Sequence, residues 1–166
     1  MPEQSTIDRA KEDLREGKSP KTAAGEFIHE EIDHVREGKH GVRSPQQAIA
    51  IGLSKARRAG IPVPPPEKGK ESTRKNAARD YEKGQSGEDQ EPSPRRSRAR
   101  EDVLEREPRS TVSHSALSKQ TRTASHKRTS EERHQAAAKA VKTKGREELQ
   151  DAAKKAARTR AKKKAA

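Results

Sequence analysis

The chain has no cysteine and almost no aromatic or large aliphatic side chains. Without cysteine it can form neither disulfides nor thiolate metal sites, and it has no cysteine nucleophile. Leu, Ile, Val and Phe together number 18 of 166 residues, while alanine alone numbers 23. So few large apolar residues, together with a net charge of +13, are typical of chains that are disordered over much of their length. We therefore expect no enzyme with a deep, dry pocket, no small-molecule substrate and no cofactor.

Long apolar stretches are also lacking. The longest segment without a charged residue runs from Ser44 to Ser54, which is too short to cross a bilayer. The first residues lack the basic-then-apolar order of a signal peptide. We expect a soluble, cytoplasmic protein with no membrane partner.

The positive charge is concentrated at one end of the chain. Residues 1–66 carry a net charge of +1 and residues 67–108 a net charge of zero, whereas residues 109–166 hold 17 Lys or Arg against five acids. The larger apolar residues show the opposite bias and gather in the first 66 positions. This distribution predicts a mainly α protein with extensive disorder in three parts. They are a small helical module (1–60), a Pro- and charge-rich linker with one or two short helices (61–108), and a basic, conditionally helical tail (109–166).

Three amphipathic segments predict the N-terminal module. They cover residues 3–17, about 21–37 and 44–60, with apolar residues at spacings of three and four. Gly17 and Gly38 are placed to end the first two helices, each within a copy of the tetrapeptide Arg-Glu-Gly-Lys. The apolar faces of the last two segments supply the expected core residues, which are Phe27, Ile28, Ile32, Val35, Ile49 and Leu53.

The third segment has the clearest helix boundaries. Ser44 is a candidate N-cap, Gln47 completes a Ser-x-x-Gln capping box, and Gly60 is placed to end the helix. Ile51 lies off the apolar face, so either the burial is broad or a partner covers it. A core this small would be marginally stable alone, and we expect self-association through the N-terminal helices.

The rest of the chain shows weaker signals. Residues 61–66 (Ile-Pro-Val-Pro-Pro-Pro) indicate a stiff polyproline spacer, and residues 85–100 should be disordered. A capping box beginning at Thr129 opens an alanine-rich helix, Gly145 interrupts it, and a last helix runs from about 146 to 160.

Two short motifs resemble known chemical signatures but have the wrong spacing. His29 and His34 flank two glutamates, yet they lie five residues apart, whereas the zinc-protease helix needs four to place both rings on one face. Gly17-Lys18-Ser19 resembles the end of a phosphate-binding loop, but the glycine required five residues earlier is Glu12. We therefore assign no metal site and no catalytic residue, and we expect a non-enzymatic protein.

The basic tail is the main functional candidate. Residues 152–166 contain seven Lys or Arg and no acid, and alanines keep the predicted helix slim. Such a helix can lie along a phosphate backbone and bind through counterion release, without choosing a sequence. With one Phe, one Tyr and no Trp, the chain has no aromatic platform for single-stranded bases. The candidate nucleic-acid-binding residues are Lys139, Lys142, Lys144, Arg146, Lys154, Lys155, Arg158, Arg160, Lys162, Lys163 and Lys164.

Residues 25–60 resemble a family of small uncharacterised bacterial proteins with a Lys-Gln-Ala-Ile-Ala-Ile-Ala-Leu-Ser-Glu-Ala-like helix. The matching residues are Gln47, Ala48, Ile49, Ala50, Ile51, Leu53, Ser54 and Ala56. The chain departs from the pattern at Gln46, at Gly52, where the family has alanine, and at Lys55. This resemblance implies no activity. Separately, the last 30 residues resemble in composition the Lys/Ala tails of linker-histone-like bacterial proteins.

These observations predict a sequence-independent DNA-binding protein of the nucleoid-associated type, with RNA as an alternative polymer. A second hypothesis is a hydrophilic, stress-type protective protein that is disordered in solution, since the mean hydropathy is −1.37 and 39% of residues are charged. The segregated charge argues against it, because a generic protectant has no need of a basic end. The sequence leaves open DNA against RNA, the partner of residues 44–60, the oligomeric state and any regulation.

Overall fold

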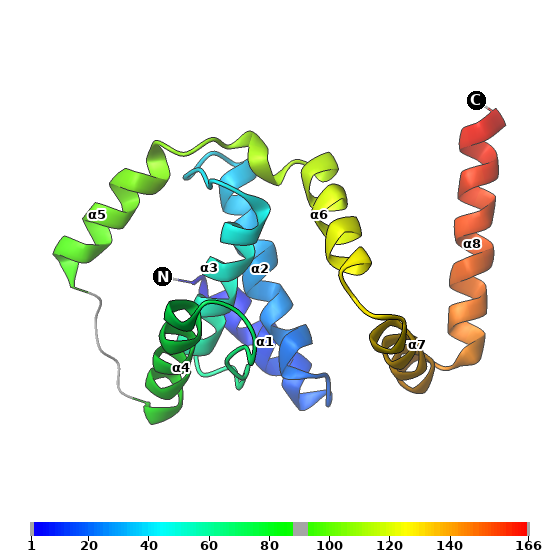
Figure 1. Ribbon diagram of the computed structural model, residues 1–166, viewed down its shortest axis with the longest axis horizontal. Helices are drawn as coiled ribbons and strands as arrows, with labels where there is room; N and C mark the ends of the chain where they lie inside the picture. The colour runs from blue at the N-terminus through cyan, green and yellow to red at the C-terminus, as the bar shows by residue number, and fades with distance from the viewer. Residues whose placement is uncertain (1, 88–92, 166) are drawn as a thin grey trace. The chain divides into compact units, whose positions relative to one another are not determined.

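A computed structural model describes residues 2–87 and 93–165, and all regular secondary structure in these ranges is helical (Figure 1). The mainly α class is therefore confirmed, whereas the expected extensive disorder is not, because helices cover most of the described residues. The chain divides into two compact units, residues 1–120 and 121–166. The elements are α1 (Gln4–Arg15), α2 (Pro20–Arg36), α3 (Pro45–Arg58), α4 (Glu71–Ser86), α5 (Pro94–Glu105), the 3-10 turn η1 (Ser110–Val112), α6 (His114–His126), α7 (Ser130–Lys144) and α8 (Arg146–Ala165).

The two Arg-Glu-Gly-Lys segments form the same helix-ending turn. After α1, the Gly17 N–H donates to the Leu14 carbonyl and the Lys18 N–H to the Asp13 carbonyl. Gly38 and Lys39 repeat this pair of bonds after α2, and both glycines have a positive φ, 76° and 82°. This is a Schellman turn, in which glycine accepts the left-handed conformation without steric cost. The predicted ends of both helices are confirmed.

Helix α3 begins at the predicted N-cap, but its capping box differs from the expected one. The Ser44 side chain accepts a hydrogen bond from the Gln47 N–H, as predicted. The Gln47 side chain instead accepts from the Arg43 N–H at 2.9 Å, one residue before the N-cap. The side chain of Gln47 thus ties the incoming loop to the helix rather than closing the reciprocal pair.

The first core cluster lies where α1, α2 and α3 meet. Phe27 is its largest fully buried member, and four buried alanines from the three helices surround it. Small side chains let the helix backbones approach closely, so alanine contributes more to this core than its low apolar area suggests. Ile61 and Val63, expected in a spacer, are also buried here. They continue the module beyond α3 because Gly60 reverses the chain, with the Ile61 N–H bonded to the Ala56 carbonyl.

A second cluster joins the end of α2 to residues much later in the chain. Val35, Val42, Ala48 and Val112 are fully buried, and Ile51 packs half-buried against them. The fold itself therefore explains the position of Ile51. Several hydrogen bonds attach the later segment. Thr111 Oγ1 donates to the Val42 carbonyl at 2.7 Å, the Val42 N–H donates to the Pro108 carbonyl at 3.1 Å, and Arg36 Nε donates to the Val112 carbonyl at 3.3 Å.

These contacts correct the predicted organisation in several places. Of the six expected core residues, Phe27 and Val35 are fully buried, whereas Ile28, Ile32, Ile49 and Leu53 are half-buried. The segment 61–108, predicted as a linker with one or two short helices, contains α4 of 16 residues and α5 of 12 residues. Helices occupy both described ends of the segment 85–100, which the sequence predicts to be disordered. Residues 88–92 lie outside the described residues. The compact unit continues to residue 120 because Val63 and Val112 complete clusters begun by α2 and α3.

The second unit is built differently. Between residues 121 and 162, all described residues except Ala140 and Leu149 are exposed, so α7 and α8 share a minimal contact and no core. Their order comes from local signals, namely helix-favouring alanines, a cap at Thr129 and a turn at Gly145. In the described ranges of the chain, no helix has both the length and the apolar character needed to cross a membrane.

Candidate nucleic-acid interface

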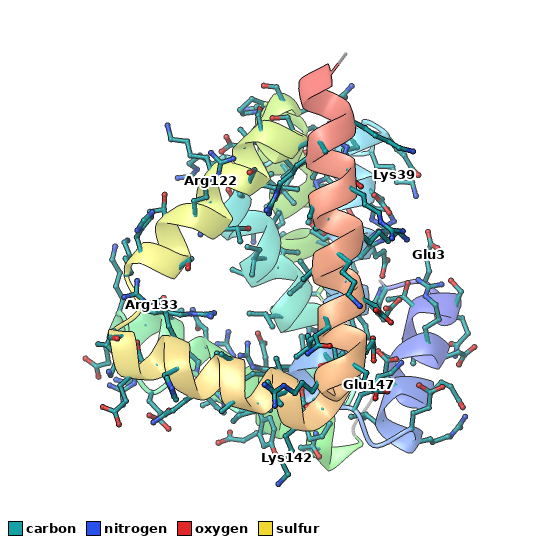
Figure 2. All side chains as sticks on the ribbon, turned by 90° about the vertical axis from the view of Figure 1, so that its right-hand side faces the viewer. Glu3, Lys39, Arg122, Arg133, Lys142 and Glu147 are labelled. Atoms are coloured by element: carbon teal, nitrogen blue, oxygen red, sulfur yellow. The ribbon has the colours of Figure 1, made fainter. Side chains whose placement is uncertain are left out.

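Helix α7 starts at a complete capping box, as the sequence predicts. The Thr129 side chain accepts from the Glu132 N–H at 3.1 Å, and the Glu132 carboxylate accepts from the Thr129 N–H at 2.9 Å. The acids thus lie at the positive end of the helix dipole, and Lys142 and Lys144 lie at its negative end. Figure 2 shows Lys142 extending from α7. This polarity stabilises the helix and leaves its last turns basic.

Helix α8 has the same polarity and a basic face. Glu147 and Glu148 occupy its first turn and Asp151 its second, whereas the turns after Asp151 carry lysine and arginine without acids. At 100° per residue, four bases fall within an arc of about 100° over a length of about 12 Å, which gives one ridge of positive charge. These four, here called the α8 ridge, are Lys154, Lys155, Arg158 and Lys162.

The α8 ridge is exposed and little neutralised. All four of its residues are exposed, and among the described side chains of α8 the one ion pair joins Lys154 to Asp151 at 3.4 Å. Arg146 and Arg160 lie on other faces of the helix, as the helical period requires. Lys139, Lys142 and Lys144 lie exposed on α7. Lys163 and Lys164 belong to α8, but their side chains lie outside those that the structure describes.

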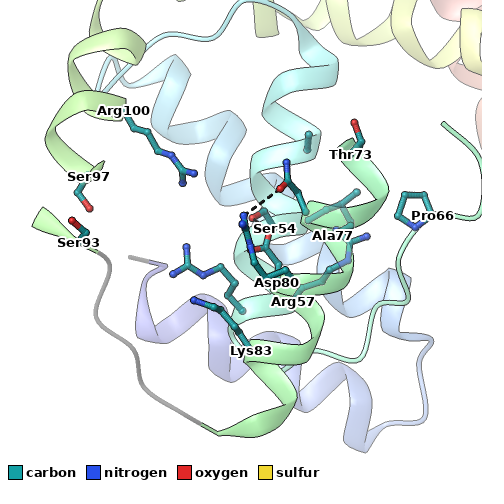
Figure 3. Close-up of a pocket in the computed structure, with 15 residues that line it drawn as sticks. Ser54, Arg57, Pro66, Thr73, Ala77, Asp80, Lys83, Ser93, Ser97 and Arg100 are labelled. Carbon is teal, nitrogen blue, oxygen red and sulfur yellow. Dashed lines mark hydrogen bonds between the residues drawn. The ribbon is translucent and has the colours of Figure 1, made fainter. Parts of the chain in front are cut away.

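The structure adds a second basic surface that charge runs in the sequence do not indicate. A cleft of about 810 Å³ lies among α3, α4 and α5 (Figure 3). Its basic side chains, here called the cleft bases, are Arg58, Arg79, Lys83 and Arg100. In Figure 3, Arg100 extends from α5 toward α3 and α4. Among the described residues that line the cleft, Asp80 is the acidic one, and its carboxylate accepts a hydrogen bond from Ser54 Oγ at 2.6 Å.

Arg57 also borders this cleft, but its guanidinium is committed to the fold. It donates to the carbonyls of Val63 and Pro64 at 3.1 and 3.3 Å, which holds the chain after α3 against the module. Burial lowers the pKa of Arg57 from its usual value, and the charge of Asp80 partly opposes that shift. Arg57 is therefore a structural residue.

Sequence reasoning missed the cleft because its bases come from three separate helices. Residues 67–108 are electrically neutral overall, so Arg79 and Arg100 are inconspicuous among neighbouring acids. The helical period alone places Arg79 and Lys83 on one face of α4, so this pair could have been recognised from the sequence. That Arg100 of α5 lines the same cleft is decided by the tertiary structure, and no sequence pattern indicates it.

Comparison with known proteins finds a similar family for one part of the first unit. Residues 15–68, which include α2 and α3, are similar to a family of unknown function, DUF6496. Neither the curated proteins nor the solved structures gave a match. The similarity thus concerns the helical module.

Proposed function

We propose that this protein binds duplex DNA without sequence preference, in a nucleoid-associated role, by laying α8 and the end of α7 against phosphates. The observation that carries this proposal is the α8 ridge, in which four exposed bases share one helix face and one of them is paired with an acid. The sequence-independent part follows from composition, because no aromatic group accompanies the tail bases to read base edges or to stack.

Phosphate contact also suits the way the second unit is held together. Its helices lack a core, so a polyanion that neutralises the repelling lysines would add the stabilisation that packing does not supply. We propose that α7 and α8 are conditionally helical and become more firmly ordered on DNA. The α8 ridge spans about 12 Å, comparable to the width of the DNA major groove.

The test is duplex-DNA binding by the full chain across a salt series, using two unrelated sequences. Each phosphate contact steepens the plot of log K against log salt by about 0.9. Replacing all four α8 ridge residues with alanine, which preserves helix propensity, should flatten that slope by up to about 3.6 and weaken both DNA sequences equally.

A matched control removes the same number of charges from the first unit. Alanine at all four cleft bases should leave the slope within about one unit of the parent value. An equal loss in the cleft variant would place the interface in the first unit and contradict the proposal. Tighter binding of duplex RNA than of duplex DNA would show that the polymer bound by this interface is RNA.

The protective-protein hypothesis remains the alternative and makes a different prediction. A chain that protects by hydration needs no polyanion, so it would not bind DNA even at low salt. It would also preserve a labile enzyme through drying equally well with and without the α8 ridge. Either result would favour that hypothesis over DNA binding.

A further inference from the structure

A group of acids and histidines surrounds the C-terminal end of α2. Glu31, His34 and His40 each place one potential ligand atom within 4.8 Å of the other two. The pair that the sequence emphasises is not brought together. His29 is 74% exposed in its side chain and pairs with Asp33 at 2.9 Å.

The backbone explains why His40 joins the group although it lies beyond the helix. The Schellman turn at Gly38 folds the chain back across the end of α2. Gly41 then packs so closely on the segment after α5 that a Cβ there would lie 1.8 Å from the Glu107 carbonyl oxygen. The Gly41 N–H also donates to the Leu104 carbonyl at 2.8 Å. His40 is thereby held between two constrained glycines.

Glu31 is the buried anion of the group. Its side chain is 1% exposed, and neither carboxylate oxygen receives a well-aligned hydrogen bond from the described residues. Lys55 Nζ lies 2.7 Å from Oε2 and offsets its charge as an ion pair. Oε1 faces His40 Nε2 at 3.3 Å, so one oxygen is directed into the group and lacks a donor of good geometry.

The second nitrogen of His40 has the arrangement expected of a metal ligand. Nδ1 lies 3.2 Å from the Gly41 carbonyl oxygen, which can accept a hydrogen bond from Nδ1–H. In that tautomer Nε2 carries no proton and faces Glu31. Ligating histidines usually donate their other ring N–H to a carbonyl or carboxylate in this way. We propose that Glu31, His34 and His40 bind one divalent transition-metal ion that stabilises the helical module.

The donor set favours Zn²⁺ over the alkaline-earth ions. Two imidazoles and one carboxylate suit a borderline metal, whereas Mg²⁺ and Ca²⁺ prefer oxygen donors throughout. Tetrahedral Zn²⁺ places its ligand atoms about 3.4 Å apart, so the group must contract slightly and a water would fill the fourth position. Glu30 and Glu3, which flank His34 at 3.7 and 3.4 Å, add negative charge beside the cation.

The experiment is a titration of the chelator-treated full chain with Zn²⁺. A separate metal-free sample is titrated with Co²⁺, whose visible absorption reports the coordination. We expect one ion per chain. Loss of a second-shell group typically weakens binding by about 10–100-fold, so His40→Gln or His34→Gln, each removing a direct ligand, should weaken it by about 100-fold or more. Excess Zn²⁺ at 100 times Kd should raise the Tm of the parent chain by about 10 °C.

His29→Gln is the matched control, because His29 is on the same helix and outside the group. It should bind Zn²⁺ as the parent does. Equal affinity in the parent and in His40→Gln would overturn the site, as would equal losses in His29→Gln and His40→Gln. If a substitution unfolds the module, the parent Co²⁺ spectrum decides: intense four- or five-coordinate absorption supports the site, and a weak spectrum of hydrated Co²⁺ overturns it.

Discussion

Gly52 offers a direct test of how closely α2 and α3 pack. It lies inside α3, where glycine is intrinsically unfavourable. A Cβ at Gly52 would lie 2.7 Å from Ile28 Cα and 2.9 Å from Ile28 N, which are backbone atoms of α2. Alanine would therefore push the two helices apart. Gly25, inside α2, provides the control, because a Cβ there meets nothing within 4 Å.

The two substitutions share the gain in helix propensity and differ in the cost of packing the added methyl group. Each gains about 0.5–1 kcal/mol from replacing glycine within a helix. Gly52→Ala alone incurs the cost of overpacking, typically about 1–3 kcal/mol. Since the helix term cancels, Gly52→Ala should be less stable than Gly25→Ala by about 1–3 kcal/mol, or about 4–12 °C in Tm at about 4 °C per kcal/mol.

Urea and thermal unfolding of the full chain, followed by circular dichroism at 222 nm, measures this difference. Gly25→Ala should exceed the parent in stability, and Gly52→Ala should fall below Gly25→Ala with an unchanged urea dependence. Equal stabilisation by both substitutions would show that α2 and α3 do not cross as closely as described, and would refute the packing argument.

Three further substitutions test other parts of the fold. Ile61→Ala should destabilise the module by about 2–5 kcal/mol in urea, since Ile61 is a core residue, whereas Pro66→Ala at an exposed position should change stability little. Thr129→Ala should remove about 1 kcal/mol of α7 stability, seen as faster amide exchange confined to that helix. Lys55→Met should cost about 3–5 kcal/mol in metal-free unfolding, because Glu31 is left buried without its partner; a neutral result would mean that Glu31 is solvated.

The candidate interface was more accessible to sequence reasoning than the other surfaces. A run of lysines and alanines determines both helix and charge locally, and the helical period then places Lys154 and Arg158 on one face. The cleft bases and the group around Glu31 could not be found in this way. His40 reaches Glu31 through the turn at Gly38, and Arg100 lines the cleft from α5, a helix separate from those that carry the other cleft bases.

The local elements followed from the sequence because their causes are local. Helix faces, the caps at Ser44 and Thr129, and the glycine-ended turns depend on residues within a few positions of one another. Tertiary structure decided which residues complete the core. Val112 and Ile61 lie outside the α-helices, so no helical pattern marks them as core residues. They are buried because folding brings their segments onto surfaces that α2 and α3 leave open. The hydrophobic effect is non-directional, so any apolar side chain that covers these surfaces stabilises the fold. The sequence alone does not show which side chain does so.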